Sequence, residues 1–169
     1  MDRRALLAGS VCLLAAPLAA ESQVSGRVPR VGFLGYVRTS STLAFEQGLK
    51  DLGWEDGRNI VLEWRWTEGD SARDPTLAAE LVRLNVDVIV APTEARVNAV
   101  RQATHTIPIV FCLVGDPVAV GYAASLRRPG GMITGLSSQW YELTGKRLEI
   151  LKETTLQVGP VAVLTNPPG

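Results

Sequence analysis

A chain of 169 residues is long enough for one domain with a buried core, and 46% hydrophobic and 20% charged residues are ordinary for a globular protein. The 17 basic and 17 acidic side chains cancel, and no basic stripe is present, which argues against a nucleic-acid-binding protein. The single histidine has no cysteine or carboxylate cluster at ligand spacing, which argues against a metal site.

Residues 1–20 have the pattern of a secretory signal peptide. Arg3 and Arg4 precede an apolar, uncharged run over residues 5–18, and a small-residue cleavage site follows. The run is shorter than the about 20 residues that a bilayer-spanning helix needs. The sequence therefore predicts export to a periplasmic or other extracytoplasmic space, and the arginine pair suggests the twin-arginine route. Residues 21–29 are predicted to be a flexible, polar lead-in.

Short apolar runs then alternate with helical patterns. Residues 31–34 form a predicted buried strand, and residues 41–52 a helix with apolar side chains at helical spacing, capped at its first or second residue. Residues 60–66 alternate apolar and polar side chains, as an edge strand does. Trp64 and Trp66 are therefore interpreted as packing residues rather than a ligand cage.

Further strand and helix units follow in the same alternation. The predicted strands are residues 86–90, 107–111, 132–136 and 161–164, and the predicted helices are residues 74–84, 94–104, 118–126 and 139–154. Asp74 is expected to cap the helix over residues 74–84. The helix over residues 139–154 is expected to bury Leu143, Leu148 and Leu151. Strands that alternate with helices imply an α/β fold with a doubly wound parallel sheet, covered on both faces.

A ligand of such a sheet sits beyond the carboxyl ends of the strands, where the strand order reverses. The loops after Gly35 and Val90 are the predicted crevice. Tyr36 offers a stacking face and a hydroxyl, and Thr93 would cap a helix whose free N–H groups favour a carboxylate. Glu94 flanks the same crevice.

Three more polar residues follow later strands. Asp116 would accept hydrogen bonds from a ligand amine, and Ser137 and Ser138 would donate or accept them. The predicted ligand-binding set suits a small zwitterion and comprises Tyr36, Thr93, Glu94, Asp116, Ser137 and Ser138. Structural roles compete with this interpretation: helix capping for Thr93, Asp116 and Ser138, a surface position for Tyr36, and solvation for Glu94 and Arg96.

No motif of a catalytic or nucleotide-binding site is present. The sequence lacks a phosphate-binding loop, a dinucleotide-binding glycine pattern and a nucleophile elbow. His105 precedes a predicted strand, at the end of the sheet opposite the crevice, so a nucleophile, a base and an acid have no place to gather. The chain is predicted to be no enzyme and to need no cofactor or metal. Cys112 is interpreted as a buried structural cysteine.

Many short segments, in one order along nearly the whole chain, resemble the tryptophan/tyrosine-type substrate-binding proteins of ABC importers. They are the Arg3-Arg4 export signal, RVGFLG (30–35), GLKDLGW (48–54), GRNI (57–60), LAAELV (77–82), VDVIV (86–90), TIPIVF (106–111), GDPV (115–118), RPGG (128–131) and residues 137–153 with GKRLE (145–149). Met132 stands where the family usually has Asn, and Glu94 and Arg96 where it often has small residues.

The resemblance implies a type I periplasmic-binding-protein-like fold, with two α/β lobes, strand order 2-1-3-4-5, and solute bound between the lobes. Residues 30–137 would be the N-terminal lobe, and residues 138–169 the start of a second lobe that is mostly missing. The implied function is the exported solute-binding component of an ABC import system. It would present a small organic solute, such as an amino acid, to a membrane permease by hinge closure. The incomplete second lobe predicts weak or absent binding by these 169 residues alone.

Three alternatives stay open at this point. A ligand-sensing regulatory domain of the same fold would carry a DNA-binding helix-turn-helix in place of the export signal. A small exported α/β enzyme would lose turnover on mutation of Tyr36 or Asp116. A nonfunctional, truncated remnant would be revealed by the reading frame beyond Gly169.

Overall fold

The computed structural model describes residues 27–138, 140–155 and 162. Its elements in chain order are β1 (Arg30–Gly35), α1 (Ser40–Asp51), β2 (Val61–Trp66), the 3-10 turn η1 (Ser71–Arg73), α2 (Asp74–Arg83), β3 (Val88–Val90), α3 (Glu94–Ala103), β4 (Ile109–Val114), β5 (Ile133–Ser137) and α4 (Trp140–Thr154). The predicted signal peptide, most of the lead-in, and all of the strand predicted over residues 161–164 except Ala162 lie outside the described residues.

The five strands form one parallel sheet in the order β2-β1-β3-β4-β5. The chain starts in the sheet at β1, turns to β2 at one edge, and crosses back over β1 to β3 on its other side. The strand order therefore reverses between β1 and β3, which is where such sheets bind ligands. The predicted doubly wound fold and its strand order are confirmed.

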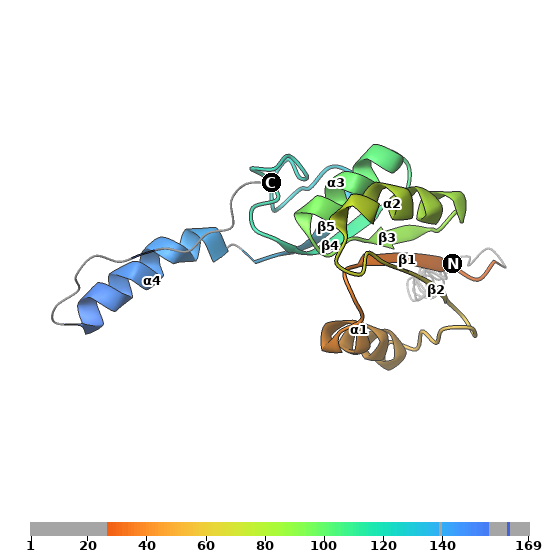
Figure 1. The fold of residues 1–169 in the computed structure, drawn as a ribbon, viewed down its shortest axis with the longest axis horizontal. Coiled ribbons are helices and arrows are strands. Elements are labelled where there is room, and N and C mark those ends of the chain that lie inside the picture. The colour runs from red at the N-terminus through yellow and green to blue at the C-terminus, as the bar shows by residue number, and fades with distance from the viewer. Residues whose placement is uncertain (1–26, 139, 156–161, 163–169) are drawn as a thin grey trace, which may run out of the picture.

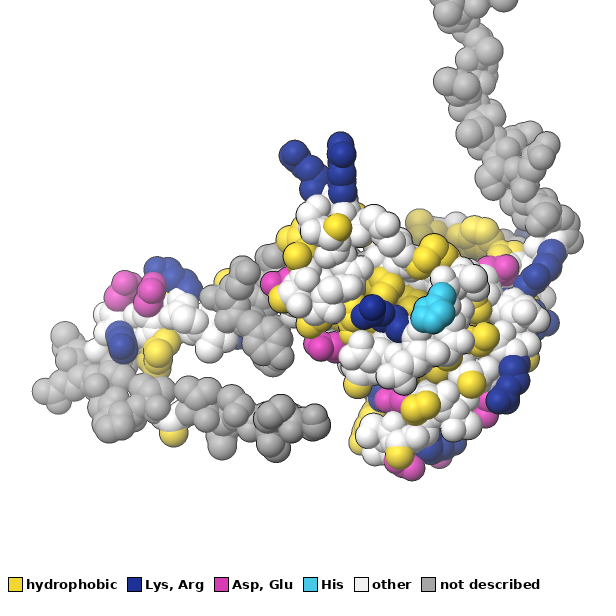
Figure 2. Space-filling view, turned by 90° about the horizontal axis from the view of Figure 1, so that it is seen from above, with side chains coloured by type: hydrophobic (Ala, Val, Ile, Leu, Met, Phe, Trp, Pro, Cys, Tyr) yellow, Lys and Arg dark blue, Asp and Glu magenta, His cyan; other side chains and the backbone are white. Residues whose placement is uncertain are grey.

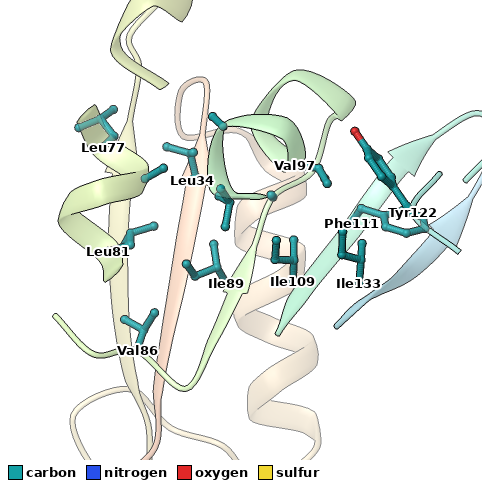
Figure 3. Packing of buried hydrophobic residues seen from close by; sticks show 14 of the residues in the cluster. Leu34, Leu77, Leu81, Val86, Ile89, Val97, Ile109, Phe111, Tyr122 and Ile133 are labelled. Carbon is teal, nitrogen blue, oxygen red and sulfur yellow. The ribbon is translucent and has the colours of Figure 1, made fainter. Parts of the chain in front are cut away.

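One face of the sheet carries α2 and α3, and the opposite face carries α1 (Figure 1). Alternate strand residues point toward α2 and α3, because successive side chains of a strand point to opposite faces. Leu34, Ile89 and Ile109 from the strands pack there with Leu81 and Val97 from the two helices (Figure 3). These side chains are at most 2% exposed, so this layer is the hydrophobic core.

The α1 face of the sheet is aromatic rather than aliphatic. The Phe33 ring lies 5.5 Å from that of Phe45 on α1 and 4.9 Å from that of Trp64 on β2. The rings of Trp64 and Trp66 stack at 5.4 Å and 9°. The two tryptophans are therefore packing residues of the edge strand, as predicted. They remain half-buried.

The helix starts differ from the predicted caps. Thr39 is the N-cap of α1, and Thr42 instead closes a capping box by accepting from the Thr39 N–H at 2.9 Å. Asp70 caps the turn η1, which leads directly into α2, so Asp74 lies inside the first turn instead of capping it. A 3-10 turn in front of a helix moves the cap upstream.

The helix predicted over residues 118–126 does not form. The segment makes one turn, in which Tyr122 N–H donates to Pro117 O at 2.8 Å, and then breaks. Gly121 has a φ of +72°, which a helix does not tolerate. The Tyr122 hydroxyl donates to Asn98 Oδ1 at 2.7 Å, which anchors the turn to α3.

The last described helix, α4, extends away from the sheet beyond β5 (Figure 1). Leu143 and Leu151 are 48% and 43% exposed, and Leu148 is half-buried. The prediction that α4 buries these leucines is wrong for Leu143 and Leu151, because none of the described elements packs closely along that stripe. No helix among the described residues is long and apolar enough to cross a membrane.

Basic and acidic side chains are interspersed on the face of the molecule seen in Figure 2. His105, the single histidine, is exposed there. It precedes β4 and so lies at the amino end of the strands, opposite the predicted crevice.

Candidate functional site

A cavity of about 370 Å³ lies at the carboxyl ends of β1 and β3, at the point where the strand order reverses. We call it the switch-point cavity. Its lining consists of Phe33, Gly35, Tyr36, Val37, Thr39, Ser41, Thr42, Phe45, Trp66, Pro92, Thr93, Arg96, Cys112 and Leu113. The loops after Gly35 and Val90, predicted as the crevice, therefore share one cavity. Its volume is in the range of small-molecule sites.

Tyr36 forms part of the cavity rim and is 54% exposed. Its backbone is fixed, because its carbonyl accepts from the Glu68 N–H at 2.9 Å, which extends the β1–β2 pairing into the loop. The Arg96 guanidinium carbon lies 5.8 Å from the centre of the Tyr36 ring, within cation–π range. About half of Tyr36 stays exposed and accessible to a ligand.

Arg96, on the first turn of α3, is buried at the cavity wall. The sequence left open that it is simply solvated, but only 8% of it is exposed. Its Nη1 donates to Thr93 Oγ1 at 3.1 Å, and its Nη2 to Thr67 Oγ1 at 3.3 Å. Its Nε lies 3.5 Å from Asp74 Oδ1. Three segments of the chain thus hold one guanidinium at the cavity wall.

Asp74 is the buried partner of Arg96, with 7% of its side chain exposed. Neither Asp74 Oδ1 nor Arg96 Nε makes a hydrogen bond in the described structure. Burial raises the pKa of Asp74 above its usual value, and the positive charge of Arg96 opposes that rise only in part. The pair is close enough for attraction but is not satisfied by hydrogen bonds.

The N-terminus of α3 faces the same cavity through Thr93. Thr93 has the extended backbone of an N-cap, but its side chain makes no cap hydrogen bond. Its hydroxyl accepts from Arg96 instead. The prediction that Thr93 caps the helix with its side chain is therefore wrong, and the first turn of α3 keeps its positive end uncapped.

Asp116, Ser137 and Ser138 gather at the carboxyl ends of β4 and β5, outside the lining of the switch-point cavity. Asp116 Oδ1 accepts from the Val118 and Ala119 N–H groups at 2.9 and 3.0 Å. The Ser137 hydroxyl donates to Gly115 O at 2.7 Å, and the Ser138 N–H donates to Val114 O at 3.0 Å. The Asp116 contacts stay within its own turn, and the two serine contacts join the ends of β4 and β5.

Glu94 opens α3 next to Thr93, and its side chain is exposed. Its carbonyl accepts from the Tyr122 hydroxyl at 3.2 Å. The six predicted site residues therefore lie at one end of the sheet. Tyr36 and Thr93 share the cavity, whereas Glu94, Asp116, Ser137 and Ser138 lie beside it.

A larger hollow of about 720 Å³ lies between α1 and β2, lined in part by Lys50, Trp54, Asp56 and Trp64. None of its lining residues comes from β3 or the loop after it, so it does not span the point where the strand order reverses. We therefore regard the smaller switch-point cavity as the candidate site.

The described residues contain no group of three or more His, Cys, Asp or Glu side chains that could hold a metal ion. Cys112 is half-buried rather than fully buried, and it lines the switch-point cavity. Burial raises the pKa of its thiol.

The sequence carried a partial signal for Arg96. It stands three residues after Thr93, and residues three apart on a helix lie on the same face. Nothing in the sequence pattern pointed to Asp74 or Thr67 as its partners, since these belong to other elements.

A model of the ABC transporter substrate binding protein family matches residues 38–168. A tyrosine-binding protein of Clostridioides difficile (strain R20291) is 33% identical to the chain over 122 residues, which are 72% of this chain and 35% of that protein. The chain thus spans about a third of the length of this relative.

Two solved structures resemble the fold. A conserved domain protein from Vibrio cholerae has a TM-score of 0.59 and 32% identity, over 73% of this chain and 45% of that one. A ligand-free, open substrate-binding protein with adhesive properties from Clostridium difficile has a TM-score of 0.60 and 26% identity, over 70% and 43%. Because the family match covers most of the chain and these folds superpose on it, the chain belongs to the ABC transporter substrate binding protein family.

Proposed function

We propose that the chain is the N-terminal part of the solute-binding component of an ABC import system, and that it binds a small organic solute such as an amino acid. The observation that carries the proposal is the switch-point cavity, where an aromatic wall of Phe45 and Trp66 meets Tyr36, Thr93 and Arg96. The name of the Clostridioides difficile relative, a tyrosine-binding protein, supports an amino acid as the solute.

The lining of the cavity suits binding without chemistry. It holds hydroxyls, aromatic rings and one guanidinium. No described histidine or carboxylate belongs to this lining, so no general base stands beside a hydroxyl or thiol in the cavity. We propose a protein that holds its solute unchanged.

The same proposal includes two lobes and a membrane partner. Residues 30–137 would form one lobe and residues 138–169 the start of the second, so that the solute is enclosed when the lobes close. The partner would be an ABC permease, and the protein would work in an extracytoplasmic space after export through residues 1–20.

Titration calorimetry with the twenty L-amino acids tests the proposal, using the full-length product of the gene that encodes these residues. We expect one or a few amino acids to bind with micromolar affinity, as a closing two-lobed site would give. The 169 residues alone should bind the same ligand much more weakly, because closure needs both lobes. Absence of binding to the full-length protein across the panel would contradict the proposal.

A further inference from the structure

Arg96 is the one charged side chain among the described residues that line the switch-point cavity. The remaining lining is aliphatic, aromatic, hydroxyl or thiol. A single fixed cation in an otherwise neutral cavity attracts one anionic group, and the low dielectric of a mostly apolar wall strengthens that attraction. Asp74, the ion-pair partner of Arg96, lies outside this lining, so the charge presented to the cavity is positive.

The guanidinium has donors left for a ligand. Arginine carries five N–H groups, and the described residues accept from Nη1 and Nη2 only through the Thr93 and Thr67 hydroxyls. Both of these acceptors are neutral, so they orient the Arg96 guanidinium without neutralising its charge. Asp74 lies on the Nε side of the group, at 3.5 Å and without a hydrogen bond. The terminal nitrogens keep free donors.

The start of α3, whose N-cap side chain makes no cap hydrogen bond, lies on the same wall. The Thr93 hydroxyl that would ordinarily cap the helix is occupied by Arg96. The exposed Glu94 carboxylate lies in the same first turn and offsets part of the helix charge. The guanidinium is therefore the group that a ligand carboxylate would meet.

We propose that Arg96 is the specificity-determining residue of the solute site, and that it selects ligands that carry a free carboxylate. Asp74 is a positioning residue, which holds Arg96 against the cavity wall from behind. This inference rests on the proposed solute-binding function, because it assigns the solute class of that same site.

A site built to hydrogen-bond a charged group rejects an analogue that lacks the group, since its buried donors are then left unpaired. The wild-type protein should therefore bind an amino acid at least about 10-fold more tightly than the matching amino acid amide, which is the ratio expected for one charged hydrogen-bonded contact.

The test uses calorimetry on the full-length protein, with L-tyrosine and L-tyrosinamide as probes and the other L-amino acid and amide pairs as further probes. The double variant Arg96→Met with Asp74→Asn removes both charges at once, so that no lone charge is left buried. In this variant the preference for the acid should fall to near unity. Arg96→Lys, which keeps the charge but not the planar fork, should keep a reduced preference.

The matched control is Arg101→Met. Arg101 is on the same helix, but its guanidinium lies 5.3 Å over the Tyr122 ring and outside the cavity lining. This variant should keep the full preference for the acid. Thermal unfolding of each variant, followed by circular dichroism, checks that the fold is intact.

The outcomes separate the two proposals. If no amino acid binds the wild-type protein, the proposed function fails, and the assignment of Arg96 fails with it. If an amino acid binds but its amide binds equally well, or the double variant keeps the preference, the assignment of Arg96 is overturned while the proposed function stands. The wild-type comparison needs no variant, so equal binding of acid and amide would overturn the proposed selection for a carboxylate even if a substitution prevents folding.

Discussion

The two faces of the sheet are built in different ways. On the α2 and α3 face, aliphatic side chains such as Leu34, Leu81 and Ile89 are fully buried. On the α1 face, Phe45, Trp64 and Trp66 are half-buried, and hollows of about 370 and about 720 Å³ lie beside α1. The same strands supply both faces, because successive side chains point in opposite directions.

This difference separates stability from ligand binding. Branched aliphatic side chains fill the space between a sheet and two helices at close to crystal density. Flat rings under a single helix leave gaps, and one of these gaps reaches the carboxyl ends of the strands. The first face therefore supplies the rigid support, and the second face contributes the space that we propose holds the solute.

Leu81→Ala should break the close-packed face most severely. Leu81 is fully buried, and truncation of such a leucine costs about 2–5 kcal/mol of unfolding free energy through lost burial and the cavity left behind. Leu52→Ala is the matched control, since Leu52 at the end of α1 is 77% exposed, and its cost should be within about 0.5 kcal/mol. Urea unfolding measures both. Equal losses would contradict the close packing described for Leu81.

Arg96→Met probes the place where the two faces meet, at the start of α3. The substitution leaves Asp74 buried beside an apolar side chain. Either its carboxyl group takes up a proton, or the folded protein carries an unpaired buried charge, and both cost stability. We expect a loss of about 2 kcal/mol in urea unfolding at neutral pH.

Adding Asp74→Asn to Arg96→Met should recover part of that loss, because the lone buried charge disappears. The buried pair would be contradicted if the double variant lost more unfolding free energy than the two single variants lose together.

Phe45→Leu tests the looser aromatic face. The Phe45 ring lies 5.5 Å from that of Phe33 and meets the Trp64 ring edge-on at 6.2 Å. Such ring pairs contribute about 0.5–1.5 kcal/mol beyond their buried area, so the variant should lose about 1 kcal/mol in urea unfolding. A loss as large as that of Leu81→Ala would show that the aromatic face is as tightly packed as the aliphatic one.

The smallest expected effect is a pH dependence from Asp74. Because burial raises its pKa, the folded protein holds the Asp74 proton to a higher pH than the unfolded chain does. This contribution to stability is complete below the unfolded-state pKa and is lost as the pH rises through the folded-state pKa. Its slope is at most about 1.4 kcal/mol per pH unit.

Urea unfolding of the wild type and of Asp74→Asn, measured at steps upward from about pH 4, isolates that slope. The variant should lack the decline that the wild type shows. Parallel curves for the two proteins would mean that Asp74 has an ordinary pKa.

The amino-acid sequence by itself determined the α/β class, the position of most strands, and the end of the sheet where a ligand would bind. Period-two and period-3.6 patterns are local, and a strand–helix–strand order leads to a parallel sheet whose carboxyl ends share one side. For that reason Tyr36 and Thr93 were predicted at one end of the sheet, where both line the switch-point cavity.

Only the tertiary structure decided which polar residue is buried there. Arg96 is held by Thr67, 29 residues away in the sequence, and by Asp74 on another helix. The turn in place of a helix at residues 118–126, and the exposure of Leu143 and Leu151 on α4, were decided in the same way. Burial depends on what packs against a side chain, and a local pattern does not contain that information.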